Sequence, residues 1–258
     1  MYIPENLGHN TFMKKNIIWK ILIYFIIYSI IGFYLETIFA LLTKGTLESR
    51  QSFLYGPFCM VYGVGAICLI FCLNKYKNNT AKLFLYGMIV GAFVEYFSSY
   101  IGELIMHIKW WDYSGAFLSI HGRTCLFYAV CWGLLSIPLI KYINPFLDKL
   151  IDNLFQKVST SFWKTAISII TLFLIFDGAL SVYALDIFLT RVSTDYNINI
   201  AGVENIESEN EFLSELFSNE KMMLTYPNML VVNEKQEIVE VGKVLSNIQN
   251  YYYKLGSK

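Results

Sequence analysis

The sequence predicts an all-α integral membrane protein: a polytopic bundle of about five transmembrane helices with a small extramembrane region at its C-terminus. Hydrophobic residues make up 55% of the chain and charged residues only 16%, whereas soluble domains carry about 25% charged residues. The apolar residues are also gathered into runs close to the roughly 20 residues that a helix needs to cross a bilayer. Because unpaired backbone amides are costly in lipid, such runs are expected to be helical rather than strands of a β-barrel.

The expected spans follow one another as residues 17–42, 53–73, 81–106, 124–140 and 166–189. The first has the basic flank of a signal peptide, but it is longer than a signal h-region and lacks an A-x-A-like cleavage site, so we interpret it as a retained span. Residues 144–161, between the last two spans, mix leucines with aspartates and lysines and predict an amphipathic helix at the membrane surface. The cysteines all fall inside spans without a CxxC pair, which favours a packing role.

The composition changes after the fifth span. The chain is therefore expected to divide into a transmembrane domain, residues 1–192, and an acidic extramembrane C-terminal region, residues 193–258. Within that region, residues 208–224 carry apolar side chains at near-helical spacing and predict a short amphipathic helix. Residues 229–232 and 238–241 are short apolar runs separated by polar residues, a pattern typical of a β-hairpin.

The distribution of basic residues predicts the orientation in the membrane. Lysines precede or open the first span, and others gather between the second and third spans and between the fourth and fifth, whereas the alternate loops carry few. By the positive-inside rule the N-terminus is expected in the cytoplasm, and an odd number of spans then places the C-terminal region outside. The acidic and basic residues are segregated although the net charge is +0, and no nucleic acid is expected as a partner.

Ionisable residues inside the spans are the main functional signal, because each costs about 2.5 to 3.5 kcal/mol at the bilayer centre. In the third span Glu95 shares one face with small and polar residues between Gly91 and Gly102, and Glu36 lies on a similar stripe of the first span. These stripes are expected to face protein and to let the two helices approach each other closely. The alternative is that the carboxylates only accept interhelical hydrogen bonds or pair with arginines. The acids concerned are Glu36, Glu95, Glu103, Asp177 and Asp186.

The loop between the third and fourth spans contains Trp110-Trp111-Asp112-Tyr113-Ser114, followed by Gly122-Arg123. Interfacial aromatic residues are commonly membrane anchors, but this loop could instead cover a polar site in which arginine binds a carboxylate or phosphate. With Arg50 as a second counter-ion, the sequence predicts one outward-opening pocket for a polar or anionic substrate. Its expected substrate-binding residues are Glu36, Arg50, Tyr55, Glu95, Glu103, Trp110, Trp111, Asp112, Tyr113 and Arg123.

A metal site is a weaker alternative. Glu103 and His107 form an i,i+4 pair, and Asp112 and His121 lie nearby in the sequence. Such residues can hold zinc, but their spacing matches no defined motif, so no metal and no cofactor are expected. The chain also lacks a GxxxxGK[ST] loop and is not expected to bind ATP itself.

Several motifs together resemble one family. They are Gly32-Phe33 with Glu36, Arg50 followed by Tyr55-Gly56-Pro57, Tyr62-Gly63, Glu95-Tyr96 with Glu103, the Trp-Trp-Asp-Tyr-Ser run at 110–114, and Gly122-Arg123 with Cys125-Leu126. On these residues the chain is similar to the bacterial membrane family of ABC-transporter permeases, type IV, most strongly over residues 26–136. The resemblance implies a multi-pass plasma-membrane protein that serves as the permease subunit of a transporter. Its expected partners are the lipid bilayer, a separate P-loop ATPase subunit and other copies of the chain in a homo-oligomer.

Two functions from different classes stay open. A permease would present its cytoplasmic loops to an ATPase. A membrane-embedded enzyme acting on a lipid-linked or cell-envelope substrate would instead use Glu95, Glu103 or Asp112 as an acid or base, with Arg123 holding a phosphate. Transport is favoured, because no serine, cysteine or histidine is arranged in the sequence as a nucleophile with a matched base.

Overall fold

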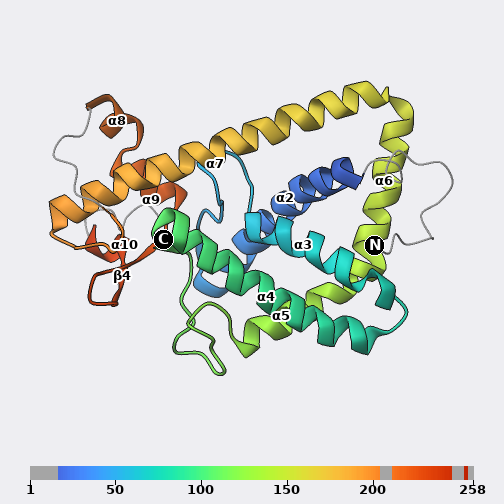
Figure 1. The fold of residues 1–258 in the computed structure, drawn as a ribbon, viewed down its shortest axis with the longest axis horizontal. Coiled ribbons are helices and arrows are strands. Elements are labelled where there is room, and N and C mark those ends of the chain that lie inside the picture. Colours follow the sequence, from blue (N-terminus) through green and yellow to red (C-terminus); the bar gives the residue numbers. More distant parts are fainter. Residues whose placement is uncertain (1–16, 204–210, 246–252, 255–258) are drawn as a thin grey trace. The chain divides into compact units, whose positions relative to one another are not determined.

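A computed structural model describes residues 17–203, 211–245 and 253–254 of the chain. Long helices joined by short connections dominate it (Figure 1). Within this described part, four helical runs are long and apolar enough to cross a membrane: Ile17–Lys44, Thr80–Met106, Leu126–Lys157 and Thr160–Tyr196. The first, second and fourth runs are the helices α2, α4 and α7. The predicted class, an all-α membrane protein, is confirmed.

The second expected span differs from the prediction. Helix α3 (Met60–Leu73) has 14 residues, a length of about 21 Å, and it continues only through the 3₁₀ turn η1 (Asn74–Tyr76). Residues 53–59, which the sequence predicts as helical, form a turn in which the Ser52 N–H donates to the Phe58 carbonyl over 2.8 Å. Gly56 has a φ of 80°, and Pro57 has no N–H to continue a helix, so α3 begins only after this pair.

The fourth span and the amphipathic helix that follows it form one helical run. Helix α5 (Leu126–Pro138) leads into a π-helical turn, η2 (Leu139–Ile143), and then into α6 (Asn144–Lys157). A proline and a π-turn both disturb the regular backbone hydrogen bonds of a helix, and the axis bends between α5 and α6 (Figure 1). The helix predicted from residue 144 is confirmed, and its amphipathic spacing buries Leu147 and Ile151 on one face.

By its internal contacts the chain divides into two compact units, and α2, α4 and α7 contribute to both. Unit 1 holds the described residues up to Ile30, with Met60–Tyr96 and Tyr113–Ile175. Unit 2 holds Ile31–Cys59, Phe97–Asp112 and the described residues from Phe176 onward. Each unit has its own hydrophobic core.

Close helix packing at small residues shapes the core of unit 1. Trp132 of α5 packs over Gly65 of α3 and Gly91 of α4, where an added Cβ would lie 2.6 Å and 2.2 Å from the tryptophan side chain. Ser29 of α2 packs on Gly63 of α3 in the same way, because a Cβ added to Gly63 would lie 2.2 Å from Ser29 Oγ. The small-residue stripes of α2 and α4, which are predicted to meet each other, are therefore in contact with α3 and α5 at these positions.

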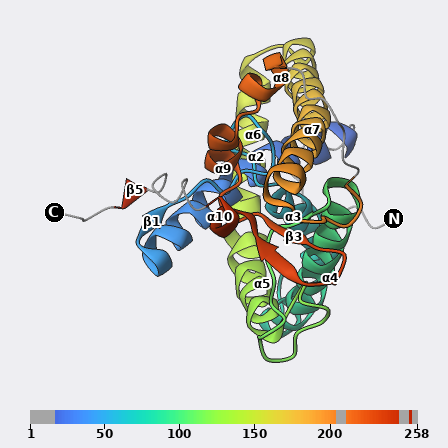
Figure 2. The ribbon, with the colours of Figure 1, turned by 90° about the vertical axis from the view of Figure 1, so that its left-hand side faces the viewer.

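In unit 2 the second half of α7 forms the centre of the core. Its residues Leu185, Phe188, Leu189 and Val192 are fully buried and pack with the C-terminal region. The predicted hairpin is confirmed, since β3 (Leu230–Val232) pairs antiparallel with β4 (Ile238–Glu240). On its other side β3, the arrow labelled in Figure 2, pairs with β2 (Ile108–Lys109), which follows α4. The helix α10 (Val241–Val244) follows β4.

The amphipathic helix predicted for residues 208–224 is divided into α8 (Glu211–Leu216) and α9 (Asn219–Thr225) in the described residues, and residues 208–210 lie outside them. The break has a physical reason. Phe217 belongs to the core of unit 2, and the Ser218 side chain accepts a hydrogen bond from the Lys221 N–H, which starts a new helix. A separate antiparallel pair joins β1 (Thr46–Leu47) to β5 (Tyr253–Lys254).

Candidate functional site

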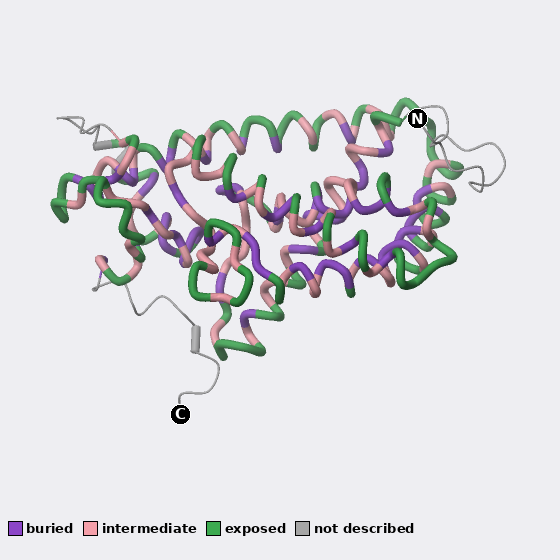
Figure 3. Tube along the Cα trace, turned by 60° about the horizontal axis from the view of Figure 1, so that its bottom comes forward, coloured by how far each residue is buried: buried purple, intermediate pink, exposed green. Residues whose placement is uncertain are grey.

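The exposure of α4 agrees with the predicted stripe. Gly91, Glu95 and Ser99 are buried, and other residues of the stripe are half-buried. The bulky residues on the opposite face, such as Phe93 and Leu104, are exposed. Buried and exposed stretches alternate along the helices in Figure 3. Helix α4 thus turns its small and polar residues toward protein and its large apolar residues outward, as a helix that contacts lipid does.

Glu95 is the polar centre of unit 1, and only 5% of its surface is exposed. The Thr124 hydroxyl donates to Glu95 Oε2 over 2.7 Å, and the Tyr113 hydroxyl lies 3.5 Å from Glu95 Oε1. The Tyr113 ring stacks on the Tyr128 ring with 4.4 Å between centroids. Hydroxyl groups thus lie at both oxygens of the buried carboxylate, as expected for a buried polar group.

The loop that precedes α5 brings these hydroxyls to Glu95 by folding back on itself. The Tyr113 N–H donates to the Gly122 carbonyl over 2.8 Å, and the Ile120 N–H donates to the Thr124 carbonyl over 2.9 Å. Gly122 has a φ of 67°, in the left-handed region that glycine adopts without strain. His121 joins the loop to α4, because its Nδ1 lies 2.8 Å from the hydroxyl of Tyr96.

Arg50, predicted as a counter-ion for substrate, lies in unit 2 and pairs with Glu48. Its Nη2 is 3.0 Å from Glu48 Oε2, and Lys44 Nζ and Asn228 Nδ2 each lie 3.0 Å from the same oxygen. Burial alone would raise the pKa of Glu48, but hydrogen bonds from Asn228, Lys44 and Thr46 outweigh it and hold this pKa below its ordinary value. The ionised Glu48 thus forms an ion pair with Arg50 within the protein and shares the same oxygen with Lys44.

The C-terminal region supplies side chains beside two other predicted residues. Lys221 Nζ lies 3.5 Å from the Tyr55 hydroxyl and 5.5 Å from the centre of its ring. The Trp110 ring packs against the Tyr226 ring with 5.2 Å between centroids. No motif in the sequence marks Lys221 or Tyr226, so sequence reasoning had no signal for these contacts.

Asp177 and Ser181 of α7 bind the backbone of the non-helical residues before α3. The Tyr55 N–H donates to Asp177 Oδ2 over 3.1 Å, and the Leu54 N–H donates to Ser181 Oγ over 2.8 Å. Asp177 and Ser181 are both 0% exposed. Buried N–H groups need partners, and these two side chains supply them for a segment without helical hydrogen bonds. The sequence marks Asp177 as an intramembrane acid, but it does not show this role.

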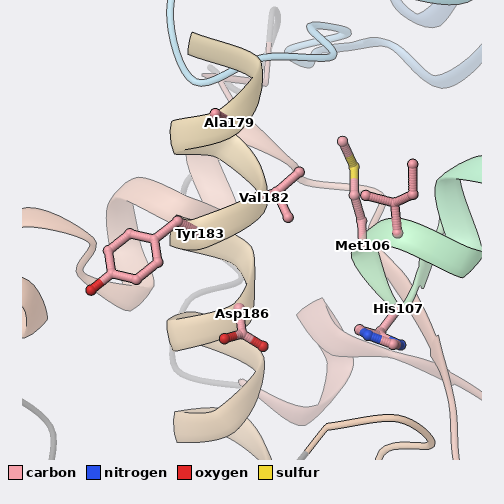
Figure 4. Close-up of a pocket in the computed structure, with 7 residues that line it drawn as sticks. Met106, His107, Ala179, Val182, Tyr183 and Asp186 are labelled. Atoms are coloured by element: carbon pink, nitrogen blue, oxygen red, sulfur yellow. The ribbon is translucent and has the colours of Figure 1, made fainter. Parts of the chain in front are cut away.

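A cavity of about 260 Å³ lies in unit 2 between the end of α4 and α7 (Figure 4). Most of its lining is apolar, and His107 and Asp186 are its polar members. Both of these side chains lie at one end of the cavity, away from Ala179 (Figure 4). The complete lining is Ile105, Met106, His107, Ala179, Val182, Tyr183 and Asp186.

The predicted pocket residues are distributed over both units. Unit 1 contains Glu95, Tyr113 and Arg123, and unit 2 contains Glu36, Arg50, Tyr55, Glu103, Trp110, Trp111 and Asp112. Of these, Glu95 and Tyr113 lie together. The contacts of Arg50, Tyr55 and Trp110 described above are with Glu48, Lys221 and Tyr226. Half-buried positions are occupied by Glu36, Glu103, Trp111, Asp112 and Arg123, and one pocket formed by all of these residues stays a prediction.

The possible zinc ligands of the sequence analysis were Glu103, His107, Asp112 and His121. Among the described residues, no group of three or more histidine, cysteine, aspartate and glutamate side chains is arranged to hold a metal ion. His121 bonds to Tyr96, and His107 lines the cavity beside α7.

Membrane-length apolar helices and a polar stripe of α4 that faces protein around the buried Glu95 define a polytopic α-helical membrane protein. The family model described as "Putative ABC-transporter type IV" matches residues 23–182. The chain belongs to this family and is therefore a transport-related membrane protein. No curated protein and no solved structure matches the chain.

Proposed function

We propose that the chain is the membrane-embedded permease subunit of an ABC-type transporter, driven by a separate P-loop ATPase. The observation that carries this proposal is the family match over residues 23–182, which takes in α3, α4, α5 and α6 and most of α2 and α7. The sequence has no GxxxxGK[ST] loop, so the energy of ATP hydrolysis would come from another subunit.

The non-helical residues before α3 support a transport function. At membrane depth, backbone outside a helix is tolerated only where protein covers it or where it lines a cavity. The amides of Leu54 and Tyr55 meet this requirement through Ser181 and Asp177. Discontinuous helices build the substrate and ion sites of many transporters, and in this proposal α3 with the turn before it has the part of one half of such a helix.

The substrate site in this proposal is polar and centred on Glu95. Tyr113 is the residue of this site proposed to bind substrate directly. Its hydroxyl lies 3.5 Å from Glu95, and it can exchange this long contact for a hydrogen bond to substrate. Arg123, which directly precedes Thr124 in the loop before α5, is the proposed cation for an anionic group of the substrate.

The proposed topology follows the positive-inside rule in the plasma membrane. The N-terminus, residues 74–79 and α6 would lie on the cytoplasmic side, where an ATPase subunit can contact them. The loop before α5 and the C-terminal region would lie outside. A homo-oligomer of the chain would give such a transporter its second permease subunit.

Site-directed crosslinking in native membranes tests the subunit role. In a background without the native cysteines, Lys149→Cys places a thiol on an exposed position of α6. It is expected to crosslink to a subunit that contains a P-loop. Phe117→Cys is the matched control, because Phe117 is 75% exposed in the loop proposed to face outside.

Recovery of the chain alone from Lys149→Cys membranes would contradict the permease proposal and favour the membrane-embedded enzyme. Equal crosslinking of a P-loop subunit from both positions would contradict the topology instead. The two results are therefore distinguishable.

A further inference from the structure

Asp177 is a buried acid without an ionic partner. It lies on α7 with 0% of its surface exposed, and within the described residues no lysine, arginine or histidine forms an ion pair with it. Lys221, a cation of the same unit, bonds to the Tyr55 hydroxyl and to the Leu216 carbonyl. Other buried acids differ, since Asp148 has Lys20 at 3.5 Å and Glu48 has Arg50 at 3.0 Å.

The two carboxyl oxygens of Asp177 have different surroundings. Oδ2 accepts the Tyr55 N–H over 3.1 Å. Oδ1 is buried and has no hydrogen-bond partner in the described part of the chain. An ionised carboxylate is unfavourable in an apolar core when one of its oxygens has no hydrogen-bond partner. In the neutral acid, Oδ2 can still accept a hydrogen bond and the protonated Oδ1 becomes a donor.

A second buried oxygen without a partner belongs to Tyr226. Its residue is 2% exposed, and its hydroxyl makes no hydrogen bond among the described residues. Burial raises the pKa of Tyr226, the nearby Ser181 hydroxyl lowers it and the negative charge of Asp177 would raise it further. The tyrosine hydroxyl thus stays neutral close to Asp177, and its oxygen is free to accept a hydrogen bond.

We propose that Asp177 is a proton-binding site in the core of unit 2 and that its neutral form donates from Oδ1 to the hydroxyl oxygen of Tyr226. The proton is taken from bulk water and returns to it, and no other reactant takes part. The groups that face the acid from the elements packed on it are the amides of Leu54 and Tyr55, the Ser181 hydroxyl and the Tyr226 hydroxyl. All of these groups are neutral, so none of them compensates a charge on Asp177.

Loss of this proton would affect the segment that Asp177 holds. Phe53 packs over Gly178, since a Cβ added to Gly178 would lie 3.3 Å from the Phe53 ring. The N–H groups of Leu54 and Tyr55 then donate to Ser181 and Asp177. Residues 53–55 are therefore packed along α7, and Tyr226 lies near Ser181 and Asp177 of the same helix. A buried negative charge here would loosen these contacts, which makes the site proton-responsive whether or not the chain transports.

Infrared spectroscopy of the full-length protein in lipid nanodiscs tests the proposal at neutral pH. A protonated aspartic acid has a carbonyl stretch separate from the carboxylate bands, and the wild type is expected to show it. Asp177→Asn should lose this band while the protein stays folded, because asparagine has the shape and hydrogen-bonding groups of the neutral acid. Asp186→Asn is the matched control on the same helix, and it should keep the band because Asp186 is exposed.

Equal spectra for the wild type and Asp177→Asn would overturn the proposal. Tyr226→Phe should keep the band but shift its frequency, and an unshifted band would overturn Tyr226 as the acceptor. If Asp177→Asn does not fold, ¹³C-labelled aspartate in the wild type decides the matter, since the absence of any label-sensitive protonated carboxyl band would overturn the site.

Discussion

Thr124 makes the shorter of the two hydroxyl contacts to Glu95, at 2.7 Å, and Thr124 itself is 3% exposed. Removing a donor from a buried acceptor costs about 1 to 3 kcal/mol, more than an exposed hydrogen bond contributes. Thr124→Val keeps the shape of the side chain and removes only this donor. It is expected to lower the thermal unfolding temperature of the protein in detergent.

Thr43→Val is the control for this substitution, because the Thr43 hydroxyl is exposed and bonds to the Phe39 carbonyl of its own helix. It should leave the unfolding temperature nearly unchanged. An equal loss in both variants would mean that Thr124 does not support Glu95.

Glu48 makes the stability of the protein depend on acid pH. Hydrogen bonds from Asn228, Lys44 and Thr46 overcome the opposing effect of burial and hold its pKa below the ordinary value of 4.5. The ionised form therefore contributes stability that is complete above the ordinary pKa and is lost as the pH falls through the lowered one. Glu48→Gln should lower the free energy of unfolding at neutral pH by about 1 to 3 kcal/mol, which is measured as a lower unfolding temperature. The variant should then lose less stability than the wild type when the pH is lowered.

The control for Glu48 is Glu240→Gln. Glu240 forms an exposed ion pair with Lys243 at 2.8 Å, and exposed pairs contribute about 0 to 1 kcal/mol. Thermal unfolding curves across acid pH that coincide for the wild type and Glu48→Gln would refute the role of Glu48.

At the scale of elements, glycine decides how closely α4 packs on α5. An added Cβ at Gly91 would lie 2.2 Å from the Trp132 side chain, and overpacking of this kind costs about 1 to 3 kcal/mol. Gly91→Ala is therefore expected to destabilise unit 1, as measured by the unfolding temperature. Gly115→Ala should be neutral by comparison, because nothing lies within 4 Å of an added Cβ there, and a loss of stability there equal to that of Gly91→Ala would contradict the packing argument.

At the scale of the whole molecule, the orientation in the membrane is open to a direct test. In a chain without native cysteines, Ser119→Cys in the loop before α5 should react with a membrane-impermeant thiol reagent added to intact cells. Asn78→Cys, in the connection between α3 and α4, should react only after the membrane is permeabilised. The reason is the excess of lysine around residue 78, which the positive-inside rule assigns to the cytoplasm, and labelling of Asn78→Cys from outside would reverse the proposed topology.

The length of α3 matters for this topology. A helix of 14 residues spans about 21 Å, whereas the hydrocarbon core is about 30 Å thick. In the proposed topology this crossing would therefore need the non-helical residues before α3, where the amides of Leu54 and Tyr55 are held by Ser181 and Asp177. The proposed proton site and the proposed second crossing would thus depend on the same contacts.

The sequence by itself determined the membrane class, four of the long helices, the amphipathic α6, the β3–β4 hairpin and the inward stripe around Glu95. These features follow from the length and periodicity of apolar runs, which are local properties of the chain. Only the tertiary structure decided which side chains satisfy the amides before α3, that Thr124 and Tyr113 bond to Glu95, and that Asp177 binds Tyr55. Residues 55 and 177 are 122 positions apart, and a hydrogen bond over such a separation leaves no periodic mark in the sequence, because it depends on how the helices pack and not on their local propensity.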